Sequence, residues 1–275
     1  MTPRTAVVTI ARGRLDHLAL QWRGLDRGSL RADDHVVVSM GDPEVTAAAR
    51  RRGCHAVEVP VVGELPLSAA RNAGARTALE RGADVLVLLD VDCVPGPELV
   101  RTYRDHVVGG DPALWCGTVA YLPPPPPDGY DLTTLGDGVA PHAARPAPEP
   151  GEVLAADHRL FWSLSFALGA AAWERTGGFA EDYVGYGGED TDFGQRARAA
   201  GVPMWWLGGA PAFHQHHPTR TPPVQHVTSI VANATRFHAR WGWWPMEGWL
   251  EQMAEEGLVT RTLTPSGARW SVTPG

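Results

Sequence analysis

The sequence predicts an α/β fold, with a mixed but mostly parallel central sheet flanked by helices and a helical, Trp-rich C-terminal extension. Short β-branched runs alternate with helical patterns through about the first ninety residues, which is typical of a parallel sheet with crossover helices. The 275 residues, 44% of them hydrophobic, can bury a substantial core, as one large domain or as two closely fused ones. We expect a single α/β unit that continues into the extension.

The predicted elements of the first half alternate in order along the chain. Strands are expected at four short apolar runs, Thr5–Ile10, His35–Ser39, Ala56–Val59 and Asp84–Leu89. Helices are expected between them, at Leu15–Leu25, Pro43–Arg52 and Ser68–Arg81. Ser68 is the expected N-cap of the third helix. This arrangement is a nucleotide-binding type of half-sheet, whose ligand should lie at the carboxyl ends of the strands.

The composition changes between Leu122 and Gly151, where five consecutive prolines occur and periodicity is almost absent. We expect a surface loop there, either a mobile lid or a passive linker. Beyond it the patterns predict strands at Phe161–Ala170 and Met204–Leu207. They predict helices at Glu189–Ala200 and Val224–Ala239.

These patterns divide the chain into four parts. The nucleotide-binding half covers residues 1–121 and the Pro-rich loop covers 122–151. The second half of the same domain covers 152–220, and the helical extension covers 221–275.

The composition excludes several classes of protein. A net charge of −7 argues against a broad nucleic-acid surface. All 24 basic residues are Arg, which excludes Schiff-base and other Lys-dependent mechanisms and leaves phosphate binding to Arg. The three cysteines form no disulfide framework, and neither a signal peptide nor an apolar run of membrane-spanning length is evident. A reduced, cytoplasmic setting is therefore expected.

The first acidic motif, Asp90-Val91-Asp92, directly follows a predicted buried strand. The two-residue spacing places both carboxylates on one side of an extended backbone. They can then share a hard divalent cation and a ribose hydroxyl. The alternative is a solvated strand end that leads into a turn.

The second acidic motif, Gly187-Gly188-Glu189-Asp190, opens a predicted helix. Carboxylates in a first helical turn are stabilised by free N–H groups and the helix dipole. Two adjacent glycines permit close approach of a ligand to the backbone. A helix cap alone rarely requires two glycines. Asp192 is expected to pair with Arg196, four residues later.

Histidine and arginine side chains provide further candidate ligands. One of His214, His216 and His217 is expected to complete a metal site with Asp92, with His214 favoured, because mixed oxygen and nitrogen donors suit Mn²⁺. A separate metal site or a surface cluster is the alternative.

Arginine forks match phosphate oxygens, so Arg12, Arg14 and Arg71 are candidate diphosphate ligands, although a solvated surface role is the alternative. Tyr186 lies among glycines and could stack on a sugar face.

These motifs together resemble the GT-A glycosyltransferases, most closely the family that contains the β-1,4-galactosyltransferases and related bacterial family 2 enzymes. The resemblance covers about Thr5 to His217, in order. The segments that carry it are Thr9-Ile10-Ala11-Arg12-Gly13-Arg14, Ala70-Arg71-Asn72-Ala73-Gly74, Asp90-Val91-Asp92, Gly177-Gly178-Phe179 and Gly185-Tyr186-Gly187-Gly188-Glu189-Asp190. Thr191, Ala11 and Tyr186 depart from the family pattern, which normally has an acid, an aromatic residue and Trp there.

The resemblance implies a role for each motif. Asp92 would ligate Mn²⁺ or Mg²⁺, with Asp90 near the ribose and a metal-bound water. Asp190 would be the general base and Glu189 would orient the acceptor. The residues implied to contact the nucleotide sugar are Thr9, Ala11, Arg12, Arg14, Asp42, Arg71, Asp90, Val91, Tyr186, Gly187 and Gly188, with Asp42 near the uracil ring.

The expected activity is the metal-dependent, inverting transfer of a hexose from a UDP-sugar. Galactose, glucose or an N-acetyl form could be the sugar, and a saccharide, a peptide or a small metabolite could be the acceptor. A sugar-nucleotide pyrophosphorylase or other nucleotidyltransferase, and a non-catalytic glycan-binding protein, are the alternatives.

Overall fold

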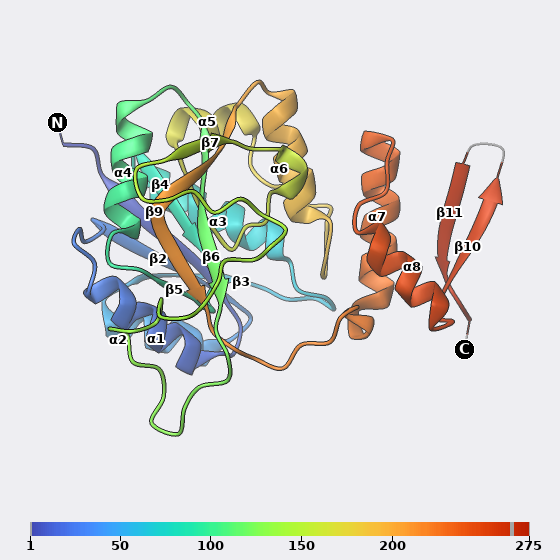
Figure 1. Cartoon of the computed structure of the whole chain (residues 1–275), viewed down its shortest axis with the longest axis horizontal. Coiled ribbons are helices and arrows are strands. Elements are labelled where there is room, and N and C mark those ends of the chain that lie inside the picture. The colour runs from blue at the N-terminus through green and yellow to red at the C-terminus, as the bar shows by residue number, and fades with distance from the viewer. Residues whose placement is uncertain (1, 265–266, 275) are drawn as a thin grey trace.

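The structure is a computed structural model that describes residues 2–264 and 267–274. Its described part contains a nine-stranded sheet in the order β3-β2-β1-β4-β8-β6-β9-β5, with β7 paired to β9 (Figure 1). The strands are β1 (Thr5–Ala11), β2 (Asp34–Met40), β3 (His55–Val59), β4 (Val85–Leu89), β5 (Cys93–Pro95), β6 (Leu114–Tyr121), β7 (Val153–Ala155), β8 (Ser165–Gly169) and β9 (Met204–His214).

The helices cover the sheet and form most of the extension. They are α1 (Leu15–Asp26), α2 (Pro43–Arg52), α3 (Leu67–Glu80), α4 (Leu99–Gly109), α5 (Ala170–Thr176), α6 (Glu189–Ala199), α7 (Val227–Trp241) and α8 (Glu247–Glu255). Short 3₁₀ turns occur at His158–Leu160 and Val224–His226.

The predicted mixed α/β sheet is confirmed. Strands β3, β2, β1 and β4 pair in parallel, whereas β8 runs antiparallel to both β4 and β6. Strands β1 and β4 are buried along their whole length, as expected for parallel strands covered on both faces. Helix α3 lies so close to the sheet that a Cβ on Gly74 would be 2.4 Å from Cγ1 of Val8, so only glycine fits there.

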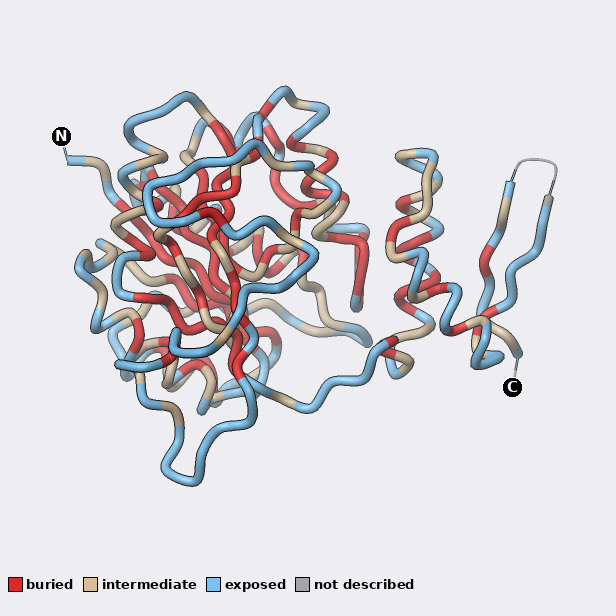
Figure 2. The backbone as a smooth tube through the Cα atoms, in the orientation of Figure 1, coloured by how far each residue is buried: buried red, intermediate tan, exposed pale blue. Residues whose placement is uncertain are grey.

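An aromatic cluster fixes the second half of the domain. Phe179 stacks on Phe193 of α6 with ring centroids 4.2 Å apart, and Trp173 and Phe166 pack around them. Figure 2 shows that buried residues gather in the sheet and in the elements that flank it. Because Phe193 is buried, this cluster sets the position of α6 and therefore of the acids in its first turn.

Several boundaries differ from the predicted ones. Helix α3 begins at Leu67, before the expected N-cap Ser68, whose side chain is buried. Only Ser165–Gly169 of the predicted strand 161–170 pairs as a strand, and the chain enters α5 at Ala170. Strand β9 continues to His214, well past the predicted end at Leu207. The sequence patterns also predicted no helix at α4 and no strand at β6.

The C-terminal extension is only partly helical. After α7 and α8 the chain forms an antiparallel hairpin of β10 (Val259–Thr264) and β11 (Gly267–Val272). Its inward side chains, including Trp270 at 3% exposure, join a small core with α7 and α8. The expected helices are present as α7 and α8, but the hairpin was not predicted, although the alternating pattern of 259–264 favours a strand. No helix in the described ranges is long and apolar enough to cross a membrane.

Candidate active site

The first acidic motif lies at the carboxyl end of β4 and is held by hydrogen bonds to its backbone. The N–H of Asp90 donates to the carbonyl of Leu164 at 3.0 Å. The amide of buried Gln21 donates to the carbonyls of Asp90 and Cys93, at 2.7 and 3.1 Å. Thr9 donates its hydroxyl to Gln21 at 2.9 Å and is fully buried, so it supports the motif from beneath instead of facing a ligand.

Asp92 and two histidines form a candidate metal centre. Asp92 Oδ1 lies 3.5 Å from Nε2 of His214, and its Oδ2 lies 3.5 Å from Nε2 of His217. One ligand atom of each residue lies within 4.8 Å of the other two. Burial acts to raise the pKa of Asp92, but the hydrogen bond from His217 and the charges of His214 and Arg14 outweigh it, and the pKa is lowered. An ionised carboxylate and two imidazoles suit Mn²⁺ or a similar cation.

The structure shows which of the three histidines lie near Asp92, which the sequence alone could not. His214 ends β9, where it pairs with Cys93 of β5, and so lies beside Asp92. His216 is exposed, and its N–H donates to the hydroxyl of Tyr130 at 3.2 Å. His214, the favoured candidate, and His217 thus both lie beside Asp92, whereas His216 does not.

The loop after β1 lies next to this centre. Arg14 adopts a left-handed conformation (φ 54°), and its Nη1 lies 3.0 Å from Asp92 Oδ2. Asp42 accepts a hydrogen bond from the N–H of Gly13 at 2.6 Å and caps α2. The Gly13 hydrogen bond is the main cause of the lowered pKa of Asp42. Arg12 is exposed beside this loop, whereas Ala11 and Val91 are buried and could offer only backbone atoms to a nucleotide.

Arg71 joins the two acidic motifs. Its Nη2 lies 3.2 Å from Asp90 Oδ1, and its Nη1 lies 3.6 Å from Glu189 Oε1 and from Asp190 Oδ1. Its side chain is only 6% exposed, and although burial acts to lower its pKa, the three carboxylates raise it. The guanidinium of Arg71 thus lies among the protein's own acids, and its expected role as a diphosphate ligand stays a prediction.

The acidic turn depends on three glycines with positive φ. These are Gly185 (79°), Gly187 (95°) and Gly188 (88°). A Cβ on Gly187 would lie 2.9 Å from Sδ of Met246, so the turn packs directly against the extension. The glycines thus let the chain enter α6 with Glu189 and Asp190 facing Arg71.

Glu189 and Asp190 differ in environment. Glu189 is buried, and burial together with the charge of Asp190 raises its pKa to about 7, against the opposing effect of Arg71. Asp190 is 23% exposed and accepts the N–H of Ser163 at 3.0 Å through Oδ2. Asp90 has its pKa raised to about 6, chiefly by burial. Of the two acids in the turn, Asp190 is the one that a substrate can reach.

Asp192 has a structural role, but not the one we expected. Its Oδ1 accepts hydrogen bonds from the Tyr183 hydroxyl (3.1 Å), Arg240 (2.8 Å) and Trp241 Nε1 (2.8 Å). Arg196 donates instead to backbone carbonyls at the start of the Gly-rich loop, including that of Gly178 at 3.1 Å. The predicted Asp192–Arg196 pair is therefore wrong. Asp192 holds α7 against α6.

Tyr186 lies within the Gly-rich turn, between Gly185 and Gly187. It is 40% exposed, and its ring stacks with His226 at 5.0 Å and with Trp249 at 6.1 Å between centroids. Two aromatic residues of the extension therefore hold the ring that we expected to meet a sugar.

The chain matches known proteins across this site. A family model described as the N-terminal domain of galactosyltransferase matches residues 157–218, which include the acidic turn, His214 and His217. The fold is similar to that of S. aureus TarS, with a TM-score of 0.55 and 10% identity over 86% of this chain and 40% of that chain. It is also similar to GalNAc-T7, in a structure with UDP, GalNAc and Mn²⁺, with a TM-score of 0.57 and 12% identity over 92% of this chain and 57% of that chain. The chain has a GT-A glycosyltransferase fold.

Two curated relatives of this GT-A chain are each named validoxylamine A glucosyltransferase. They come from Streptomyces hygroscopicus subsp. jinggangensis (strain 5008) and subsp. limoneus. Each is 31% identical over 194 residues, which is 62% of this chain. The chain spans 44% and 41% of their lengths, less than half of either. The resemblance to glycosyltransferases drawn from the motifs is confirmed.

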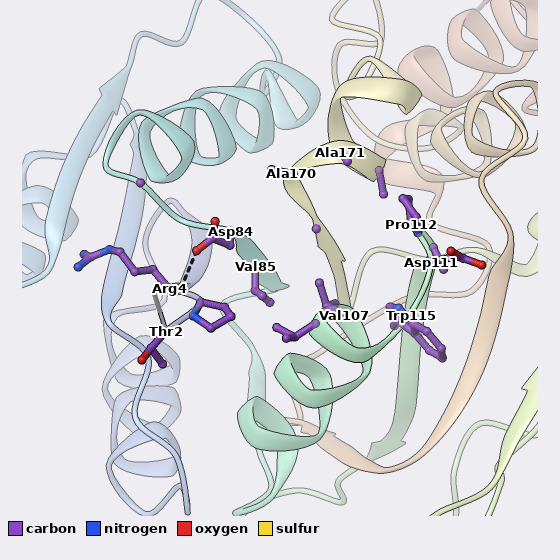
Figure 3. Close-up of a pocket in the computed structure, with 17 residues that line it drawn as sticks. Thr2, Arg4, Asp84, Val85, Val107, Asp111, Pro112, Trp115, Ala170 and Ala171 are labelled. Atoms are coloured by element: carbon purple, nitrogen blue, oxygen red, sulfur yellow. Dashed lines mark hydrogen bonds between the residues drawn. The ribbon is translucent and has the colours of Figure 1, made fainter.

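A separate hollow of about 460 Å³ lies at the opposite end of the GT-A sheet (Figure 3). Its lining includes Arg4 and Asp84, joined by a 2.8 Å hydrogen bond from the Arg4 N–H, together with Val107 and Trp115. Arg4 directly precedes β1 and Asp84 directly precedes β4, whereas Asp90 and Asp92 follow β4. The hollow is thus remote from the acidic motifs.

Proposed function

We propose that this chain is a metal-dependent, inverting glycosyltransferase that moves a hexose from a UDP-sugar to an acceptor hydroxyl. The observation that supports this function best is the bridge through Arg71, which holds Asp90 of the first motif beside Glu189 and Asp190 of the second. A group bound at Asp92 and an acceptor at Asp190 would therefore lie in one site.

Asp92, His214 and His217 would hold the cation, and their oxygen and nitrogen donors fit a Mn²⁺ or Mg²⁺ ion. A divalent cation bound there would offset the negative charge that develops on the leaving diphosphate. Arg14, beside Asp92 and 37% exposed, would add donors for phosphate oxygens. The similar GalNAc-T7 structure is one with UDP and Mn²⁺, which is in keeping with this assignment.

Asp190 would act as the general base. The N–H of Ser163 fixes its carboxylate, and an oxygen that accepts one hydrogen bond can accept another from an acceptor hydroxyl. In the reaction the acceptor oxygen attacks the anomeric carbon, the bond from that carbon to the UDP oxygen breaks, and the hydroxyl proton passes to Asp190. Glu189, buried behind Asp190, would orient the acceptor through the same turn.

The donor and acceptor are proposed at the level of class. The relatives named as glucosyltransferases make UDP-glucose the first donor to test, ahead of UDP-galactose and the N-acetyl forms. Asp42 and the loop after β1 would contact the nucleotide. The acceptor is a hydroxyl compound near Tyr186.

The function is tested by UDP release with each of these donors, with and without Mn²⁺, and by the NMR configuration of the product. We expect Mn²⁺-dependent release of UDP and an inverted anomeric centre. Release of pyrophosphate would identify a nucleotidyltransferase, and the absence of any turnover would favour a glycan-binding protein. A product that keeps the donor configuration would disprove inversion.

Asp190→Asn tests the base. The amide cannot take the proton, so turnover should fall by about 100-fold or more while UDP affinity stays within about twofold. Asp111→Asn is the matched control, because Asp111 is exposed at the opposite end of the sheet and should keep full turnover. Near wild-type turnover in Asp190→Asn would show that the base has been assigned wrongly.

A further inference from the structure

Four rings from four separate segments form a continuous row beside the site. Tyr121, the last residue of β6, stacks on His214 with centroids 4.6 Å apart and an interplanar angle of 27°. His142, from the Pro-rich segment 122–151, contacts Tyr121 at 5.6 Å and Trp162 at 5.0 Å. We name Tyr121, His142 and Trp162 the aromatic wall.

The aromatic wall extends from one chemical centre to the other. At one end His214 contacts both Tyr121 and Asp92. At the other end Trp162 precedes Ser163, whose N–H donates to Asp190. A sugar held between a diphosphate at Asp92 and an acceptor at Asp190 would therefore lie along these rings.

The wall is fixed in place although part of it comes from an irregular segment. The N–H of His142 donates to the carbonyl of Val119 at 3.1 Å, next to the bridge between Ala120 and Pro141. The guanidinium of Arg145 lies over the rings of Trp162 and Trp206, 5.2 and 4.5 Å from their centroids. These contacts tie the Pro-rich segment to β6, β9 and the approach to β8.

The wall also remains open to a ligand. Tyr121 is 44% exposed, His142 is exposed and Trp162 is half-buried. Exposed aromatic faces next to a few directed polar groups are typical of a small-molecule site. Carbohydrates fit such a wall because their C–H faces are apolar and their hydroxyls need hydrogen-bond partners.

His142 supplies a directed donor within the wall. Its Nδ1 accepts the N–H of Ala144 at 3.2 Å, so the neutral ring carries its proton on Nε2. Within residues 2–264 and 267–274, Nε2 of His142 has no hydrogen-bond partner. A hydroxyl of a bound sugar can accept this bond.

We propose that the aromatic wall holds the transferred hexose and that His142 donates a hydrogen bond to one of its hydroxyls. The Pro-rich segment would then help to select which hexose the site accepts. The inference rests on the proposed function. A site that is built to hydrogen-bond a hydroxyl discriminates against sugars that present it differently, so His142 would contribute to the choice among hexoses.

The test compares binding of UDP with binding of UDP-glucose and UDP-galactose, by calorimetry with Mn²⁺, in wild type, His142→Phe and His142→Ala. The phenyl ring keeps the packing on Tyr121 and Trp162 but removes the donor. We expect both variants to weaken binding of the preferred UDP-hexose about tenfold, to reduce the preference for it, and to leave UDP affinity within about twofold. His55→Ala, a change at an exposed histidine on β3, is the matched control and should alter none of these values.

Equal loss of UDP and UDP-hexose affinity would overturn the inference, because it would show that His142 acts on the nucleotide half or on folding. Unchanged affinity for all three ligands would also overturn it. Failure of the proposed function gives a different result. Wild type would bind neither UDP nor any UDP-hexose if the protein only binds glycans, and it would consume UDP-hexose when pyrophosphate is added if it is a nucleotidyltransferase.

Discussion

Arg71 is the residue on which both acidic motifs depend. Each nitrogen at its end lies near a carboxylate from a different part of the chain, and the side chain is almost fully buried. Four charged groups, Arg71, Asp90, Glu189 and Asp190, thus share one buried site, with more acid than base. The excess negative charge and the burial explain why Glu189 holds its proton more tightly than an ordinary glutamate.

The pKa of Glu189 predicts how stability changes with pH. In the folded protein this pKa is about 7, above the ordinary value of 4.5, so the folded state binds the proton more tightly than the unfolded state. Its contribution to stability is therefore fully present below pH 4.5 and is lost as pH rises through about 7. Glu189→Gln removes this loss, and its unfolding free energy should decline less between about pH 5 and about pH 8.

Urea denaturation at a series of pH values in that window measures the effect. Glu251→Gln, at an exposed position of α8, is the control and should keep the wild-type decline. The same decline in Glu189→Gln as in wild type would contradict the assignment.

Asp192 and Arg240 should be energetically coupled, because the carboxylate is fully buried and Arg240 is its charged partner at 2.8 Å. A double-mutant cycle with Asp192→Asn and Arg240→Gln should give a coupling free energy of about 1 to 3 kcal/mol, measured by denaturation. The matched cycle with Arg196→Gln should give about 0 to 0.5 kcal/mol, since Arg196 binds carbonyl groups instead. A larger coupling with Arg196 would support the pair first expected from helix spacing.

At the scale of elements, the Gly-rich turn connects the sheet domain to α7 through direct contacts. Gly185 has φ 79°, and a Cβ there would lie 2.5 Å from Cβ of Ser229 on α7. Asn233 of the same helix donates to the carbonyl of Val184 at 3.1 Å. The turn that presents Asp190 is thus supported from the outside by the extension.

Gly185→Ala should therefore cost more stability than an equivalent change elsewhere. Gly53, at the end of α2, has φ 81° with nothing within 4 Å of its added Cβ, so Gly53→Ala reports backbone strain alone, about 1 to 2 kcal/mol. We expect Gly185→Ala to lose a further ~1 to 3 kcal/mol from the clash with Ser229, and to lose turnover as Asp190 shifts. Thermal and urea unfolding of both variants give the comparison. Equal losses of stability in Gly185→Ala and Gly53→Ala would show that α7 shifts to accommodate the added methyl group without a loss of stability.

For the molecule as a whole, a cation bound at Asp92 should stabilise the folded state, because only folding brings Asp92 to His214 and His217. Excess Mn²⁺ should raise the midpoint of thermal unfolding, by an amount that grows with the ratio of Mn²⁺ concentration to its dissociation constant. His217→Ala should remove most of this shift, whereas His216→Ala should keep it, since His216 lies outside the cluster. A shift that depends on His216 and not on His217 would contradict the proposed ligand set.

The sequence by itself determined the order and type of most elements in the sheet domain and the two acidic motifs. These features depend on near neighbours: apolar periodicity over a few residues, glycines before a helix, and acids after a buried strand. For the same reason it predicted the opening of α6 at Glu189 but missed the hairpin at the end of the chain, where short alternating runs compete with a helical pattern.

Only the tertiary structure decided which side chains meet. Arg71 lies beside Asp90 and Glu189, Asp192 beside Arg240, His217 beside Asp92, and His142 beside Tyr121. Each pair joins segments that are distant in sequence, so its formation depends on how whole elements pack and not on local spacing. The local sequence was equally consistent with a solvated arginine and with an ion pair within one helix. The packing of α3 and α7 on the sheet domain gave these charges other partners, because a buried charge needs a partner nearby. The packing of the Pro-rich segment likewise brought His142 to Tyr121.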